Sequence, residues 1–264
     1  MSVLETLHHP ELIPGATHPV RRLLPEPADT TVAEQLATLE LKELARPERP
    51  YLVLNFASTL DGRAAIDGRS GPIGSVTDTE LLQRLRTRVD AVMIGAGTMR
   101  AERYGRMVSD PQLRAYRERT GLAHDPLAVI VSNRLGLPWD ASLFTDGGGR
   151  VVIFTASDQE PPQTATPVTV VRHPDGVELD RALEWLRWER GICSVLCEGG
   201  PTLHGRLREG GLADELFLTV APKIAGGEGP RVLEGALPDI DEVELAWLLE
   251  SDSELFARYR GISD

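Results

Sequence analysis

Short runs of almost purely apolar residues alternate with amphipathic segments through most of this chain. "DAVMIGA", "PLAVIVSN" and "RVVIFTA" are three such runs, and "ELDRALEWLRWERG" is a helical segment with one apolar face. A strand that is apolar at nearly every position is buried on both faces, which is typical of a parallel sheet covered by helices. Near the C-terminus, "EVELAWLLESDSELFARYR" instead predicts two strands around a tight turn. The pattern predicts an α/β fold with a predominantly parallel, mixed sheet flanked by helices and a C-terminal antiparallel hairpin.

The first part of the chain does not follow this alternation. Residues 1–29 are rich in Pro and His and show no periodicity, so we expect an arm without regular structure. Residues 30–45 predict an amphipathic helix, in which Thr31 and Glu34 fit a capping box. The polar segment 104–125 is interpreted as a loop. Because no linker follows residue 50, we divide the chain into an N-terminal arm and helix (1–46) and one larger domain (47–264).

Charge and composition exclude several classes of function. The net charge is −12, which argues against a nucleic-acid partner because such a protein needs a basic face. No apolar run approaches the length of a membrane span and no secretory signal is found at the start, so we expect a cytoplasmic protein without a membrane partner. Cys193 and Cys197 lack further ligands at zinc spacing and are interpreted as reduced thiols, so no metal site is expected.

Two segments share one layout: a strand, a glycine turn, a small or hydroxyl residue, and a helix. They are "DAVMIGAGTM" and "CSVLCEGGPT". Ligands of open α/β sheets bind outside the carboxyl ends of the strands, and glycine lets the backbone approach them closely. A helix N-terminus there favours an anion. We therefore expect a pyrophosphate cradle at Gly199, Gly200, Pro201, Thr202 and Leu203, with a second contact at Gly97 and Thr98.

The dinucleotide fingerprint of the Rossmann fold is absent from these turns. In "GAGTMR", Arg100 stands where the third small residue of the fingerprint belongs. A dinucleotide that binds this chain therefore binds to a different fold.

Two acids flank the glycine turns. Asp61 in "STLDGR" follows the first core strand, and the alternative to a catalytic role is a turn former before Gly62. Glu198 ends a central strand, where a buried carboxylate is costly unless it has a partner. The alternative to a role in the site is an ion pair with a nearby arginine.

Three stretches together resemble a known family. "NFASTLDGRAA", "LRTRVDAVMIGAGTMRAER" and "CEGGPTLHGRLREGGLADELFLTVAPKIAGG" are similar to the pyrimidine reductase domain of riboflavin biosynthesis, which has a dihydrofolate-reductase-like fold. The similarity runs from about Arg49 to the C-terminus, and the motifs of the deaminase half of that enzyme are absent. The resemblance implies hydride transfer from NADPH to the ribosylamino carbon of a small, phosphorylated pyrimidine. Relatives are commonly homodimers, so we expect a homodimer here.

The resemblance also implies roles for individual residues. Cofactor contacts fall on Ala57, on Thr98, on Glu102, where the family usually carries Asp, and on the stretch from Gly199 to Arg206. Substrate contacts fall on Ser70, Arg86 and Glu198.

The substrate motifs depart from the family pattern. Pro72 stands where the family often carries Trp, and the "DDP.LT.R" stretch of the family reads "AERYGRMVSD" here. The phosphate-binding arginine of that stretch has no clean match, so Arg106, or else Arg103, is expected to replace it. Arg100 and Arg134 are the candidates for a contact to the 2′-phosphate of NADPH.

Reduction of a C=N carbon leaves a nitrogen that needs a proton. Glu198 is the first candidate donor and Asp61 the second, and in the alternative interpretation Glu198 only anchors the substrate. Two other functions stay open: reduction of a pterin or dihydrofolate-like substrate, and nucleotide binding without catalysis on the same fold.

Overall fold

One eleven-stranded sheet organises the part of the chain that the structure describes. The structure is a computed structural model that describes residues 11–66, 68–235, 240 and 242–261. The strand order is β2-β1-β10-β11-β9-β3-β8-β4-β5-β6-β7. The strands are β1 (Pro19–Leu24), β2 (Ala28–Thr31), β3 (Tyr51–Thr59), β4 (Ala91–Gly95), β5 (Leu127–Val131), β6 (Val151–Thr155), β7 (Val168–Arg172), β8 (Ser194–Cys197), β9 (Glu215–Ala221), β10 (Glu244–Ser251) and β11 (Glu254–Arg260).

The sheet has a parallel part and an antiparallel part, which meet at β9. Strands β9, β3, β8, β4, β5, β6 and β7 are parallel neighbours, whereas β11, β10, β1 and β2 extend the sheet in antiparallel pairs. The fold class expected from the sequence, including the C-terminal hairpin of β10 and β11, is confirmed.

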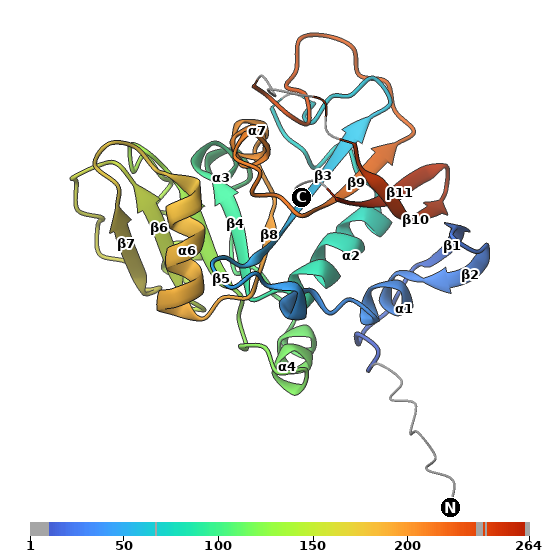
Figure 1. Cartoon of the computed structure of the whole chain (residues 1–264), viewed down its shortest axis with the longest axis horizontal. Helices are drawn as coiled ribbons and strands as arrows, with labels where there is room; N and C mark the ends of the chain where they lie inside the picture. Colours follow the sequence, from blue (N-terminus) through green and yellow to red (C-terminus); the bar gives the residue numbers. More distant parts are fainter. Residues whose placement is uncertain (1–10, 67, 236–239, 241, 262–264) are drawn as a thin grey trace, which may run out of the picture.

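Helices cover both faces of this sheet, as Figure 1 shows. The side chains of α1, α2 and α4 pack on one face, and those of α6 and α7 pack on the other. The α-helices are α1 (Val32–Ala37), α2 (Val76–Leu85), α3 (Ala96–Glu102), α4 (Pro111–Arg119), α5 (Ser142–Thr145), α6 (Leu179–Arg190) and α7 (Pro201–Glu209), and two 3₁₀ helices are η1 (Leu41–Leu44) and η2 (Arg86–Arg88). Within the described ranges, no helix combines the length and the apolar character needed to cross a bilayer.

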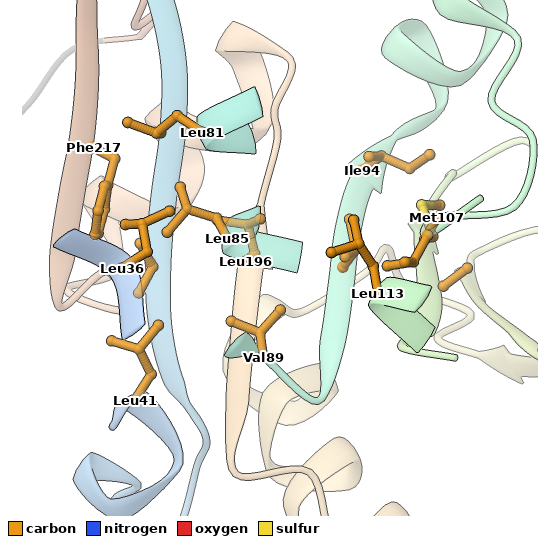
Figure 2. Close-up of a cluster of buried hydrophobic side chains, with 14 of the residues drawn as sticks. Leu36, Leu41, Leu81, Leu85, Val89, Ile94, Met107, Leu113, Leu196 and Phe217 are labelled. Carbon is orange, nitrogen blue, oxygen red and sulfur yellow. The ribbon is translucent and has the colours of Figure 1, made fainter. Parts of the chain in front are cut away.

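The core on the first face joins the N-terminal helix to the sheet. Figure 2 shows Leu36 of α1 and Leu81 and Leu85 of α2 beside Phe217 of β9. All four side chains are buried, so α1 contributes to the same core as the parallel strands. Burial of side chains of this size contributes roughly 1.5–3 kcal/mol each to folding.

The N-terminal segment is more regular than the sequence predicted. We expected residues 1–29 to lack regular structure and residues 30–45 to be helical, but residues 19–24 form β1, residues 28–31 form β2, and β1 pairs with β10. The predicted capping box of Thr31 and Glu34 is present, but α1 ends at Ala37 and the 3₁₀ helix η1 follows it. Residues 1–10 of the expected arm lie outside the described residues, and the division at residue 46 stays a prediction.

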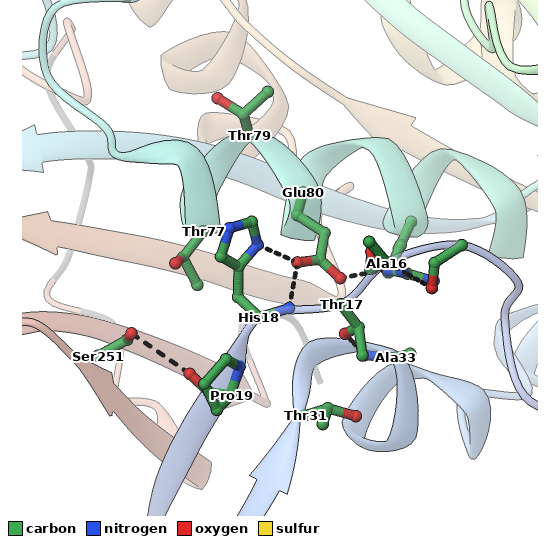
Figure 3. Close-up of polar contacts among 12 residues, drawn as sticks. Ala16, Thr17, His18, Pro19, Thr31, Ala33, Thr77, Thr79, Glu80 and Ser251 are labelled. Carbon is green, nitrogen blue, oxygen red and sulfur yellow. Dashed lines mark hydrogen bonds and ion pairs between the residues drawn. The ribbon is translucent and has the colours of Figure 1, made fainter.

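Polar contacts attach this segment to the back of α2 (Figure 3). The Glu80 carboxylate accepts a hydrogen bond from the backbone N–H of His18 at 2.8 Å and lies 2.5 Å from Nδ1 of the His18 ring. Arg84 donates to the carbonyl oxygens of Ile13 and Ala16, both at 2.8 Å. The strands β1 and β2 are therefore tied to α2 as well as to β10.

One helix was missed. The segment 104–125, expected to be a loop, contains α4. Asp110 caps it by accepting a hydrogen bond from Gln112 N at 2.7 Å, and Pro111 occupies its first position. Arg117 is buried and donates to the carbonyl oxygens of Arg86 and Val89. A buried guanidinium in place of an apolar residue obscured the helical periodicity.

Candidate functional site

A cavity of about 540 Å³ lies at the carboxyl ends of β3, β4 and β8. Its walls come from these strand ends, from α2, α3 and α7, and from the loop that follows β3. This is the position at which open α/β sheets bind ligands.

The two glycine turns form one wall of the cavity and touch each other. The N–H of Gly95 donates to the carbonyl oxygen of Gly199 at 2.6 Å. A Cβ atom on Gly200 would lie 2.9 Å from Oγ1 of Thr98, so only glycine fits between the turns without a shift. A Cβ atom on Gly97 would meet no atom within 4 Å, so this position opens onto free space. The structure thus brings together the two turns that the sequence singled out.

Most residues predicted to contact the cofactor border this cavity, among them Ala57, Thr98, Glu102, Gly199, Gly200, Pro201, Thr202 and Leu203. Gly205 of the predicted stretch does not line it, nor do Arg100 and Arg134, the candidates for the 2′-phosphate. Glu102 also accepts hydrogen bonds from the backbone N–H and the hydroxyl of Ser70, at 3.0 and 2.9 Å. This contact holds the loop after β3 against α3, and Ser70 borders the cavity as well.

His204 lies beneath the second turn. Its ring packs against Gly199, where an added Cβ would lie 3.1 Å from Cε1, and its Nε2 lies 3.3 Å from the carbonyl oxygen of Cys197. The ring of Phe56 is 4.9 Å away, centroid to centroid. Burial lowers the pKa of His204 to about 4, so the ring is neutral at pH 7. The sequence placed His204 in the cofactor stretch but did not reveal this support.

Glu198 is paired with Arg86. The guanidinium donates Nε and Nη2 to the two carboxylate oxygens at 2.6 and 2.7 Å, and its Nη1 donates to the carbonyl oxygen of Met107 at 2.9 Å. The hydroxyl of Tyr104 donates to the same carboxylate at 2.9 Å. The ion pair that the sequence left open as an alternative for Glu198 is therefore present.

The pair is closed off from water on most sides. The Glu198 side chain is 3% exposed and the Arg86 side chain 9%. Burial by itself lowers the pKa of Arg86, but the charge and hydrogen bonds of Glu198 outweigh it, and the pKa stays above its ordinary value. Burial, reinforced by the Glu198 charge, raises the pKa of Tyr104. Glu198 borders the cavity, whereas Arg86 lies behind it.

Asp61 holds a loop and does not border the cavity. Its carboxylate accepts hydrogen bonds from the Thr59 hydroxyl at 2.6 Å and from the backbone N–H groups of Ala225 and Gly226, at 3.1 and 2.7 Å. These hydrogen bonds, that of Thr59 foremost, lower the pKa of Asp61 to about 2. A carboxylate with this pKa carries no proton at neutral pH, so the geometry favours the structural alternative for Asp61.

The arginines expected at the substrate phosphate do not border the cavity. Arg106 is paired with Asp125 at 2.6 Å, and Arg103 with Asp140 at 2.7 Å. Among the described residues that line the cavity, the arginine is Arg206 of α7, whose Nη2 donates to the Val177 carbonyl oxygen. A substrate role for Arg86 or Arg106 stays a prediction without support from this arrangement.

Asp78 is a cavity residue that sequence reasoning missed. It lies in the first turn of α2, and its Oδ1 accepts a hydrogen bond from the Thr219 hydroxyl of β9 at 2.6 Å. Burial raises the pKa of Asp78 against the lowering effects of Thr219 and Lys223. In the sequence, "TDTE" reads only as an acidic helix start, because nothing local shows that β9 lies opposite. In the described part of the chain, no three His, Cys, Asp or Glu side chains are grouped as a metal site.

Comparison with known proteins identifies the family. Residues 50–251 match the family model described as the RibD C-terminal domain. The chain belongs to the RibD C-terminal domain family. It is 32% identical over 207 residues to a 2,5-diamino-6-ribosylamino-4(3H)-pyrimidinone 5′-phosphate reductase of Methanothermobacter thermautotrophicus, covering 76% of this chain and 91% of that relative. The resemblance expected from the sequence is confirmed.

A solved structure and a longer relative agree with this assignment. A pyrimidine reductase-like protein of Corynebacterium diphtheriae superposes with a TM-score of 0.71 at 25% identity, over 86% of this chain and 97% of that one. The riboflavin biosynthesis protein RibD of Mycobacterium tuberculosis is 31% identical over 225 residues, and the match covers 57% of that longer protein. The family is one of oxidoreductases, and the reduction its members are named for implies a nicotinamide cofactor.

Proposed function

We propose that this protein uses NADPH to reduce the ribosylamino carbon of a phosphorylated ribosylaminopyrimidine. The observation that carries the proposal is the contact between the two glycine turns at one cavity, Gly95 N to Gly199 O. The relative from Methanothermobacter carries the name of such a reductase. Both turns lie at the carboxyl ends of parallel strands, beside the cavity. The match to a family of reductases supports a role for them in binding the nicotinamide cofactor.

The residues of the cavity fit a dinucleotide. The open position at Gly97 leaves room for a pyrophosphate beside the start of α7, which is nine residues long, and the missing Cβ of Gly200 lets Thr98 lie close to that start. Bound there, the nicotinamide would supply the hydride. The chain's own contribution is to hold both reactants in a pocket that displaces water and fixes their relative orientation.

The experiment is a direct assay with matched substrates. Purified protein is mixed with NADPH and either the 2,5-diamino or the 5-amino-uracil form of the ribosylaminopyrimidine phosphate, and loss of NADPH absorbance is followed. We expect turnover with at least one of them. NADPH binding without turnover on any pyrimidine substrate would instead favour the non-catalytic interpretation.

One observation favours a second candidate, a reductase of an unphosphorylated pterin-like substrate. Arg86, Arg103 and Arg106 do not converge on the cavity, and a pterin needs no such convergence. The same assay with a dihydropterin or dihydrofolate separates the two candidates. A preference of more than about tenfold in kcat/KM for either class, roughly 1.4 kcal/mol, would decide between them.

The choice of NADPH over NADH is part of the proposal. Arg100 and Arg134 remain the candidates for the 2′-phosphate, and Arg100 at present donates to the Gly136 carbonyl oxygen at 2.9 Å. We expect NADPH to bind more tightly than NADH, and the Arg100→Met and Arg134→Met variants to reveal which arginine sets that ratio. Equal affinity of the unmodified protein for both cofactors would contradict the choice.

We also propose that the protein is a homodimer, because its relatives are commonly homodimers. Sedimentation equilibrium of the purified chain measures the oligomeric state directly. A monomer at assay concentrations would contradict the proposal and leave the catalytic one intact.

A further inference from the structure

We propose that Asp78 is the catalytic acid that gives a proton to the substrate nitrogen while the adjacent carbon receives hydride. The inference rests on the proposed function, because it assigns a residue to that same reaction. It applies equally to a ribosylaminopyrimidine and to a pterin, since both reductions act on a C=N bond.

The geometry places the Asp78 carboxyl between the cavity and a buried polar cluster. Asp78 borders the cavity from the first turn of α2, and Gly199 lines the same cavity. Behind it, Thr219 donates to Oδ1, and the hydroxyl of Ser75, which caps α2, donates to the carboxylate of Glu254 on β11. Glu254 is 3% exposed. Two carboxyls, Asp78 and Glu254, thus share one poorly solvated region.

The charged groups around Asp78 favour a bound proton. Burial raises the pKa of Asp78, and burial together with the Asp78 charge raises that of Glu254. The cation facing both is Lys223, which lies after β9 and whose Nζ also donates to the carbonyl oxygens of Pro72 and Ile73 at 2.8 and 2.6 Å. Burial and a neighbouring carboxyl both disfavour the ionised form of a carboxyl, so these surroundings favour the protonated form of Asp78.

The other two carboxyls that border the cavity in the described residues are occupied. Both oxygens of Glu198 accept hydrogen bonds from Arg86, and Tyr104 donates a third. Glu102 accepts two hydrogen bonds from Ser70. The Asp78 side chain instead accepts a hydrogen bond from a neutral hydroxyl, so it is the acid best placed to hold and release a proton.

The step balances in atoms and charge. In a ribosylaminopyrimidine the C=N bond forms when the ribose opens: the C1′–O4′ bond breaks, the exocyclic nitrogen loses its proton and the ring oxygen gains one. The C=N bond then becomes a CH–NH single bond, in which the carbon gains a hydride from the nicotinamide and the nitrogen gains one proton from the Asp78 carboxyl. Asp78 is left ionised and regains its proton from solvent after product leaves. Proton transfer by a positioned acid typically contributes about 10²–10⁴-fold in rate.

The test compares the Asp78→Asn variant with Glu80→Gln on the same helix. Glu80 points to the opposite side of α2, toward His18 and Arg84, so its variant controls for a general effect on the helix. We expect Asp78→Asn to lower the rate of hydride transfer at saturating substrate by on the order of 100-fold or more, with NADPH affinity within about twofold. Glu80→Gln should retain the rate. A rate for Asp78→Asn within about threefold of the unmodified enzyme would overturn the proposal.

The pH profile supplies a readout that a purely structural role would not move. The acid must be protonated to act, so the rate of the unmodified enzyme should fall as pH rises through the raised pKa of Asp78. In Thr219→Val the hydrogen bond that lowers this pKa is gone, so the fall should shift to higher pH. An unchanged profile in Thr219→Val would count against Asp78.

The pH dependence of stability tests the raised pKa of Asp78 without substrate or cofactor, so it can be measured whether or not the proposed function holds. Because the folded pKa of Asp78 lies above its unfolded value near 4, the folded state binds more protons, and stability falls as pH rises past that value. The stability of Asp78→Asn relative to the unmodified protein should therefore increase with pH. If neither substrate class is reduced, the proposed function fails; if turnover occurs and the variants leave its rate and pH profile unchanged, only Asp78 fails.

Discussion

Glu198 and Asp78 border the same cavity but have opposite surroundings. Glu198 ends at a guanidinium that matches both of its oxygens, so its burial is compensated by charge. Asp78 meets a hydroxyl and lies near another acid, and burial raises its pKa. A carboxyl at a strand end or helix start is therefore not identified as an acid catalyst by its position, but by what faces it.

The largest expected effect is the loss of stability when Glu198 loses its arginine partner. Arg86→Met leaves the Glu198 carboxylate buried without its cation, and we expect a loss of about 3–5 kcal/mol in the free energy of unfolding, measured by denaturant titration. The double variant Arg86→Met/Glu198→Met should recover most of this loss, because no charge remains buried. If Arg86→Met is as stable as the unmodified protein, the ion pair does not compensate the burial of Glu198, and Glu198 and Asp78 do not differ in this respect.

The next effect concerns His204, a third titratable group at the cavity, which burial keeps neutral. Its pKa in the folded protein is about 4 against an ordinary 6.5, so the folded state binds fewer protons between these values. Stability should fall by on the order of 2–3 kcal/mol as pH drops from about 6.5 to 4. His204→Gln should lose that part of the slope in a series of melting curves, and an unchanged slope would show that His204 is not the group responsible.

The affinity for NADPH tests the wall of the cavity that the two glycine turns form. In Gly200→Ala the new Cβ would meet Oγ1 of Thr98 at 2.9 Å, so the turns must move apart. We expect the Kd for NADPH to rise by at least about tenfold, roughly 1.4 kcal/mol. Gly136→Ala is the matched control, because an added Cβ there meets nothing within 4 Å and the residue does not line the cavity. Equal affinity for NADPH in Gly200→Ala and Gly136→Ala would contradict a pyrophosphate site at the glycine turns.

The smallest effect is expected at Asp61. Asp61→Asn removes a carboxylate that accepts hydrogen bonds from Ala225 N and Gly226 N, so the loop should loosen and the melting temperature should drop slightly. The pKa of Asp61 is depressed, so its contribution is present above pH 4 and is lost as pH falls through about 2. Loss of the fall in catalytic rate at high pH in Asp61→Asn, with that fall unchanged in Asp78→Asn, would exchange the roles proposed for the two residues.

How much of this follows from the sequence depends on the range of the interactions. The glycine turns, the closing hairpin and the Thr31 cap depend on residues a few positions apart, and these predictions hold. Asp78 could not be found in the same way, because its partner Thr219 lies 141 positions further along the chain. The pairing of Glu198 with an arginine was foreseen only as an alternative, since the sequence does not show which side of β8 faces Arg86.

The pairing of β1 with β10 covers what would otherwise be an edge of the sheet. Without β1, the eight residues of β10 would present a row of unpaired backbone groups at the edge of the sheet. Such an edge is a template for the strands of other molecules. In this fold the outermost strand is instead β2, which is four residues long and carries Asp29. Residues 19–31, which lie outside the region that the family model matches, thus replace a long edge strand with a short, charged one.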